Sequence, residues 1–150
     1  MSATVMVNGR ISSGRDAVIP VVDHGFLYGE SVYETMRTYD RRPFLYDRHM
    51  RRLRRSSQLV ALEVPFSDDE LAAGIRDTIA AAELDGAEAY IRVLLTRGVG
   101  DLTYDLKATP APSVVIIVKP QVDPPADVYE NGVPVTRRLL DAFRRAARSS

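Results

Sequence analysis

Residues 23–37, with the sequence DHGFLYGESVYETMR, bring together more chemically useful side chains than any other segment of this chain. Glycines and aromatic residues stand there among carboxyl, imidazole and guanidinium groups. Glycine permits tight bends, and a tyrosine ring with its polar tip suits a ligand that is partly apolar and partly polar. The segment therefore predicts one wall of a small-molecule site, with a bend at Gly25 and Gly29 that runs into a strand.

The basic residues of the chain are almost all arginines, since Lys107 and Lys119 are the only lysines among 20 basic residues. Arginine stays charged and binds carboxylates and phosphates through paired N–H groups, whereas a lysine amine can form an imine. Imine chemistry therefore has only these two internal candidates.

A cluster of arginines falls on the predicted helix at 47–61 and comprises Arg48, Arg51, Arg52, Arg54 and Arg55, of which all but Arg54 lie opposite the apolar stripe. The cluster either binds phosphate or forms the solvated face of an amphipathic helix. Periodicity does not choose among the four residues.

Two further patterns have both a structural and a functional interpretation. Tyr90 and Arg92 share one face of a predicted strand, either as a cross-strand packing pair or as a pocket floor in which the guanidinium binds a carboxylate. His24 either satisfies the bend around it or takes a direct chemical role.

The elements that position these residues follow from local patterns. Strands are expected at 4–7, 32–39, 88–96 and 113–119, helices at 47–61 and from 68 onward, and an edge strand or extended loop at 17–22. Asn8-Gly9 predicts a hairpin turn, Ser67 and Glu70 form a capping box, and Gly86 is expected to end the second helix. A further arginine-rich helix is expected at 136–148. Strands before and after two helices predict an α+β fold with a mixed or antiparallel sheet, in which 113–119 is central.

The bulk composition excludes several classes of function. The 150 residues suffice for one domain, and the net charge of zero gives no attraction to nucleic acid or anionic lipid. Without cysteine and with two histidines the chain predicts no disulfide and no zinc site. The longest apolar run, 114–118, is too short for a membrane span, no signal peptide is visible, and no phosphate-binding glycine loop occurs. These features fit a cytoplasmic protein.

Several motifs together resemble the N-terminal half of the class IV, or fold type IV, pyridoxal-phosphate enzymes. They are the opening strand with Asn8-Gly9, the segment 23–37, His49-Met50-Arg51-Arg52-Leu53, Ala89-Tyr90-Ile91-Arg92, and residues 96–102 with the sequence TRGVGDL. The family includes branched-chain aminotransferases, D-amino-acid aminotransferases and aminodeoxychorismate lyase. Tyr-Ile-Arg followed by RGVGDL is most similar to the branched-chain enzymes.

The resemblance implies pyridoxal 5'-phosphate as the cofactor, with an amino acid and a 2-oxo acid as substrates. Arg52 then resembles the arginine that holds the cofactor phosphate, and Arg92 resembles the one that receives the side-chain carboxylate of glutamate. The residues that resemble the walls of the substrate pocket are Tyr28, Tyr33 and Tyr90.

Further roles follow from the same resemblance. Glu34 and Arg37 match an E-x-x-R pattern, which we interpret as a pair that holds the pocket from behind. The loop 98–110 resembles one that closes the site of a partner subunit, so a homodimer is implied.

The family's imine-forming lysine has no match here, because no lysine follows Thr136-Arg137-Arg138. We therefore expect no catalytic residue in this chain and interpret 1–135 as the N-terminal lobe of the family. Residues 136–150 are interpreted as an atypical arginine-rich tail, such as an out-of-frame reading gives, with a genuine helix as the alternative.

The expected activity is transamination of branched-chain amino acids with 2-oxoglutarate, by a chain that is truncated and inactive alone. The alternatives are an aminodeoxychorismate lyase, a D-amino-acid aminotransferase, or a non-catalytic lobe that dimerises.

Overall fold

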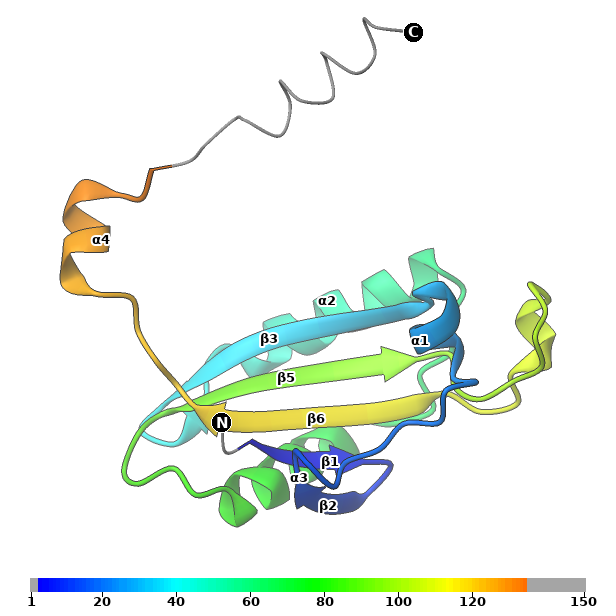
Figure 1. Ribbon diagram of the computed structural model, residues 1–150, viewed down its shortest axis with the longest axis horizontal. Coiled ribbons are helices and arrows are strands. Elements are labelled where there is room, and N and C mark those ends of the chain that lie inside the picture. The colour runs from blue at the N-terminus through cyan, green and yellow to red at the C-terminus, as the bar shows by residue number, and fades with distance from the viewer. Residues whose placement is uncertain (1–2, 135–150) are drawn as a thin grey trace, which may run out of the picture.

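The computed structural model describes residues 3–134 and contains one six-stranded sheet in the order β2-β1-β6-β5-β3-β4 (Figure 1). The strands are β1 (Thr4–Val7), β2 (Arg10–Ser13), β3 (Ser31–Tyr39), β4 (Arg42–Pro43), β5 (Ala89–Thr96) and β6 (Ser113–Pro120). The helices are α1 (His24–Tyr28), α2 (Tyr46–Leu59), α3 (Asp68–Ala81), α4 (Ala126–Asn131) and a short 3-10 turn, η1 (Leu106–Ala108). All neighbouring strands are antiparallel, and β6 lies in the interior of the sheet, so the predicted α+β fold is confirmed.

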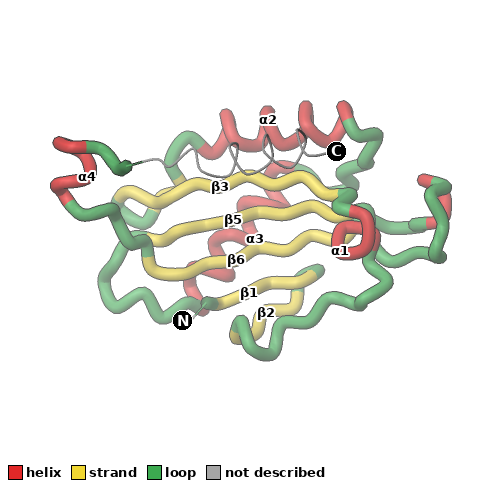
Figure 2. Tube along the Cα trace, turned by 45° about the horizontal axis from the view of Figure 1, so that its top comes forward, coloured by secondary structure: helices red, strands yellow, loops and turns green. Residues whose placement is uncertain are grey.

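Helices α2 and α3 pack on the same face of this sheet, α2 along β3 and α3 behind β1 and β6 (Figure 2). The alternation of β5 explains this layering, because its residues 89, 91, 93 and 95 are fully buried in the core against the helices. Residues 90, 92 and 94 point the other way and are only half-buried. Over most of its length, this second face carries no helix within residues 3–134.

The two long helices form where their sequence patterns predict them. In α2 the spacing of Met50, Leu53 and Ser57 gives one buried stripe. In α3 the capping box is present, with Ser67 accepting from the Glu70 amide and the Glu70 side chain accepting from the Ser67 amide. None of the helices described is long and apolar enough to cross a lipid bilayer.

Some local expectations were wrong or incomplete. The bend after residue 22 is the helix α1, which Asp23 caps at its start and Gly29 ends with a left-handed conformation. Helix α3 ends at Ala81, and Gly86 instead forms part of the turn before β5. The segment 17–22 is a loop, which is one of the two alternatives expected for it. The helix expected at 136–148 and the tail 136–150 lie outside the described residues.

Tyr46 at the start of α2 offers a test of how the two helices are joined. Its hydroxyl donates to the backbone carbonyl of Asp68, at 2.5 Å, and burial together with the Asp68 charge raises the pKa of Tyr46 to about 12. Because the folded state keeps this phenol neutral, its contribution is complete below pH 10, the ordinary value, and is lost as the pH rises toward 12. Allowing for solvent screening, the wild type is expected to lose about 1 kcal/mol of its free energy of unfolding over this pH range. Tyr46→Phe has no hydroxyl to ionise and should not show this loss.

The measurement is urea unfolding of both proteins at pH 9 and at pH 11.5. The difference in free energy of unfolding between wild type and Tyr46→Phe should shrink at the higher pH. A constant difference would show that the Tyr46 hydroxyl titrates alike in both states.

Candidate functional site

The face of the sheet without α2 and α3 carries Tyr33, Tyr90 and Arg92, three of the aromatic and basic side chains that the sequence singled out. The strand register aligns them in rows: Tyr33 opposite Leu94, Thr35 opposite Arg92, and Arg37 opposite Tyr90, which in turn lies opposite Lys119. We call this surface the open face. It is defined by residues 33, 35 and 37 of β3, 90, 92 and 94 of β5, and 115, 117 and 119 of β6.

Arg92 is at the centre of the open face and lies between two tyrosine rings. Its guanidinium carbon is 4.8 Å from the centroid of the Tyr33 ring and 5.9 Å from that of Tyr90. The Arg92 Nε is buried without a hydrogen-bond partner, and so is the Oγ1 of the neighbouring Thr35. A buried donor without an acceptor is costly, and the half-buried side chain of Arg92 makes no hydrogen bond to another residue among 3–134, so the accessible part of its guanidinium is suited to bind an oxygen of a ligand.

Lys119 extends the basic character of the open face, because its Nζ lies 5.0 Å from the Tyr90 centroid. Neither Lys119 nor Arg92 takes part in an ion pair within the part of the chain that the structure describes. Two neighbouring cations that form no such ion pair favour an anionic ligand. The sequence analysis counted Lys119 only as a possible imine-forming amine, because its place opposite Tyr90 depends on the register between β5 and β6.

The predicted pairing of Glu34 with Arg37 is wrong. In a strand, residues three apart point to opposite faces, so Glu34 lies against α2 and Arg37 lies on the open face. Arg37 instead donates to Asp123 at 2.8 Å and stacks over Tyr39.

Glu34 binds two residues of α2, His49 and Arg52. Its carboxylate accepts from the Arg52 Nε at 2.6 Å and from the Arg52 Nη2 at 2.5 Å, and it contacts the His49 Nδ1 at 2.7 Å. Burial alone would raise the pKa of Glu34, but hydrogen bonds and charges from Arg52 and His49 outweigh it and hold that pKa below its usual value. The cluster therefore keeps Glu34 ionised inside the fold.

Arg52 is the predicted phosphate-binding residue, and the structure leaves it open to solvent. Its side chain is 66% exposed, whereas Glu34 is 3% exposed. Bonding to Glu34 occupies one edge of the guanidinium, and Nη1 has no partner among residues 3–134. Sequence reasoning did not identify the cluster, although the spacing of three between His49 and Arg52 places both on one side of a helix.

Tyr28 does not join the tyrosines around Arg92 in the described contacts. It lies in α1 at one end of the sheet, and its ring packs on His24 at 4.8 Å and on Tyr104 at 5.1 Å. His24 is buried and bonds to the carbonyl of Asp101 through Nε2, at 2.9 Å. These contacts attach the loop after β5 to α1, so His24 has a structural role here.

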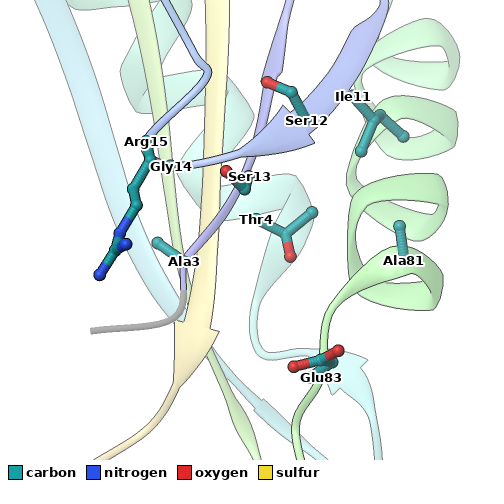
Figure 3. A pocket seen from close by; sticks show the side chains of 9 residues that line it. All are labelled: Ala3, Thr4, Ile11, Ser12, Ser13, Gly14, Arg15, Ala81 and Glu83. Atoms are coloured by element: carbon teal, nitrogen blue, oxygen red, sulfur yellow. The ribbon is translucent and has the colours of Figure 1, made fainter.

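Of two cavities in the described structure, one lies away from the open face and the other adjoins it. One cavity, of about 620 Å³, lies between the β1–β2 hairpin and the end of α3 (Figure 3). Figure 3 shows Arg15 extending away from Glu83, so the charged groups do not converge there. A smaller cavity of about 290 Å³ adjoins the open face at Leu94 and Thr96, with Ile19, Val21 and Phe26 among its walls. No group of three or more metal-ligating side chains occurs in residues 3–134.

A family model for amino-transferase class IV matches residues 31–150 of the chain. A putative branched-chain-amino-acid aminotransferase of Methanocaldococcus jannaschii is 33% identical over 150 residues, which cover 97% of this chain and 50% of the relative. An aminodeoxychorismate lyase of Bacillus subtilis is 32% identical over 76% of this chain and 39% of its own length. A D-alanine aminotransferase of Listeria monocytogenes is 34% identical over 63% of this chain and 32% of its own length.

Solved structures give the same result for the fold. A branched-chain amino acid aminotransferase from Escherichia coli superposes with a TM-score of 0.71 and 30% identity, over 81% of this chain and 42% of that one. A branched-chain aminotransferase from the archaeon Thermoproteus uzoniensis, solved with norvaline, superposes with a TM-score of 0.71 and 27% identity, over 82% of this chain and 42% of that one. The chain thus spans half or less of the length of these proteins, and its sheet matches the N-terminal lobe of fold type IV enzymes.

Proposed function

Because the chain belongs to the class IV aminotransferase family, we propose that it is the N-terminal lobe of an enzyme that exchanges amino groups between branched-chain amino acids and 2-oxoglutarate. The observation that carries this proposal is Arg92, a half-buried guanidinium that lies between two tyrosine rings and has a buried Nε without a hydrogen-bond partner among residues 3–134. Such a group binds the side-chain carboxylate of glutamate, while the tyrosine faces accept an aliphatic chain.

Pyridoxal 5'-phosphate is the proposed cofactor, and the described residues fit its phosphate group. Arg52 presents a solvent-facing guanidinium edge whose opposite edge is fixed by a buried carboxylate. Fixed guanidinium donors are the preferred protein ligands of phosphate. When bound in this family, the cofactor acts as the electron sink for the amino acid's α-carbon.

The chain's own residues then have three tasks on the open face. Arg92 binds the distal carboxylate of glutamate and 2-oxoglutarate, and Tyr33 and Tyr90 orient either substrate against the sheet. Leu94 and the apolar cavity beside it receive a branched side chain. Proton movement at the α-carbon requires an amine that we assign to no residue of this chain.

We also propose that the chain forms a homodimer through the end of the sheet that carries α1. Large apolar side chains are exposed there, including Phe26, Leu102 and Tyr104, at 73%, 75% and 82%. Exposed apolar groups that gather on one surface favour a protein contact.

The other chemistries named among the relatives remain alternatives, since the lyase of Bacillus subtilis and the D-alanine aminotransferase of Listeria monocytogenes also match. The amino donor discriminates between the two aminotransferases, because one uses a branched-chain amino acid such as leucine and the other uses D-alanine.

A fusion of residues 1–134 to the remaining half of the Methanocaldococcus jannaschii relative tests the proposal. We expect it to convert leucine and 2-oxoglutarate to glutamate, and Arg92→Ala is expected to lower kcat/KM for glutamate about tenfold, the cost of one charged hydrogen bond. The kcat/KM for leucine should change little, which makes leucine the internal control. A fusion that uses D-alanine but not leucine, or an Arg92→Ala variant with normal glutamate use, would contradict the proposal.

The polypeptide of the printed sequence alone serves as the control for that assay. We expect it to form no glutamate from leucine and 2-oxoglutarate, because neither Lys107 nor Lys119 matches the family's reactive lysine. Glutamate formed by this polypeptide, with loss of activity in Lys119→Ala or Lys107→Ala, would show that the chain holds its own amine.

A further inference from the structure

Glu34 and His49 form a cluster with Arg52, and the proposed function gives neither of them a role. Glu34 is buried on the face of β3 that packs against α2, and every oxygen of its carboxylate accepts a hydrogen bond from Arg52. The two parallel bonds fix the plane of the guanidinium, because a carboxylate and a guanidinium match only in one relative orientation. Without them, the long Arg52 side chain would be free to sample many rotamers in solvent.

His49 supports the same carboxylate from one helical turn earlier. Its Nδ1 lies 2.7 Å from the Glu34 Oε2 and 3.4 Å from the Arg52 Nη2. Because Glu34 accepts from Arg52 at both oxygens, it is ionised, and His49 must donate through Nδ1. The Glu34 carboxylate is thus held from two positions of α2 and does not follow Arg52 if that side chain turns away.

The cluster also connects the two parts of the proposed site. Glu34 follows Tyr33 directly in β3, and Tyr33 lies under the Arg92 guanidinium on the open face. Strand β3 is paired with β5 from Ser31 to Arg37, so its backbone is fixed there. A guanidinium bonded to Glu34 is therefore held at a constant place relative to Arg92.

We propose that Glu34 is a positioning residue which, with His49, holds the Arg52 guanidinium in the orientation that binds the phosphate of the cofactor. The inference rests on the proposed function, since it gives Arg52 that phosphate. Two simpler roles make different predictions. If Glu34 only repelled anions, Glu34→Gln would bind the phosphate more tightly than the wild type does. If Glu34 only attached α2 to β3, Glu34→Gln would weaken the binding of ligands with and without a phosphate equally.

The experiment is a titration of the ¹⁵N-labelled chain with pyridoxamine 5'-phosphate and, separately, with pyridoxamine, followed by NMR. Neither probe has an aldehyde, so neither reacts with the two lysines, and they differ only in the phosphate. For Glu34→Gln we expect pyridoxamine 5'-phosphate to bind about tenfold more weakly, with pyridoxamine binding unchanged. In an Arg52→Ala background, adding Glu34→Gln should change phosphate-probe binding less than twofold, since Glu34 acts through Arg52.

Glu30→Gln is the matched control, because Glu30 also binds an arginine, Arg97, at 2.8 Å, away from the cluster. It should leave the preference for the phosphate probe intact. Tighter phosphate binding in Glu34→Gln, equal weakening of both probes, or an undiminished tenfold loss in the Arg52→Ala background would each overturn the inference.

A wild-type measurement makes the result independent of whether Glu34→Gln folds. The Arg52 Nε–H signal should exchange slowly with water because of its bond to Glu34, and it should shift with pyridoxamine 5'-phosphate but not with pyridoxamine. Slow exchange without any phosphate-dependent shift would overturn the inference. If the wild type prefers neither probe, the phosphate role of Arg52 fails first. If it prefers the phosphate probe and Glu34→Gln does so equally, only the role of Glu34 fails.

Discussion

Replacement of Arg52 by alanine is expected to remove the preference of this chain for pyridoxamine 5'-phosphate over pyridoxamine. Two charge-assisted hydrogen bonds from a guanidinium to a phosphate, each contributing roughly 1.5 kcal/mol, correspond to about a 100-fold change in affinity. The measured quantity is the ratio of the two dissociation constants, which should fall to near one. Pyridoxamine binding itself should stay constant, because it lacks the phosphate.

Arg51→Ala is the matched control for this experiment. Arg51 is the neighbouring residue of α2 and is also exposed, yet it makes no described contact with Glu34. It carries the same charge, so a general electrostatic attraction of phosphate to the helix would weaken equally in both variants. An equal loss in Arg51→Ala and Arg52→Ala would assign phosphate binding to the arginine-rich face as a whole.

Replacement of Gly98 by alanine is expected to have the largest effect on stability. Gly98 has a φ of +93°, and an added Cβ would lie 1.9 Å from the carbonyl oxygen of Ala111. That contact is with backbone on the returning side of the loop 98–112 and cannot be relieved by a side-chain rotation. A loss of more than about 4 kcal/mol in the free energy of unfolding follows, or failure to fold.

Gly86→Ala is the control that measures the cost of a left-handed backbone without a clash. Gly86 has a similar φ of +82°, but nothing lies within 4 Å of its added Cβ. Only the left-handed backbone is strained there, which costs about 1–2 kcal/mol. Urea unfolding of both variants checks the prediction, and similar losses would mean that the loop moves away from Gly98 at little cost.

Local sequence patterns predicted the scaffold well, because the scaffold is built from local periodicity. The alternation of Ile91 and Val93 with Tyr90 and Arg92 identified both faces of β5, and the Ser67–Glu70 box identified the start of α3. The five-residue helix α1 was missed since it has no apolar stripe. Its end at Gly29 was interpreted as a bend.

The candidate site was predicted less completely, because its contacts join residues that are far apart in sequence. The bonds of Glu34 to Arg52 link a strand to a helix 18 residues away, and no local pattern indicates them. The supposed pair of Glu34 and Arg37 came from a motif spacing that suits a helix, whereas strand alternation separates the two side chains. The Asp123 partner of Arg37 is 86 residues away.

The adjacency of Tyr33 and Glu34 on opposite faces of β3 constrains how such a protein evolves. A single inserted or deleted codon between positions 31 and 36 would exchange inward and outward side chains along part of the strand. The bonds of Glu34 to Arg52 and the contact of Tyr33 with Arg92 would then be lost in one event. Descendants of this gene are therefore expected to diversify here by substitution, while length changes accumulate in the loops that flank the strand.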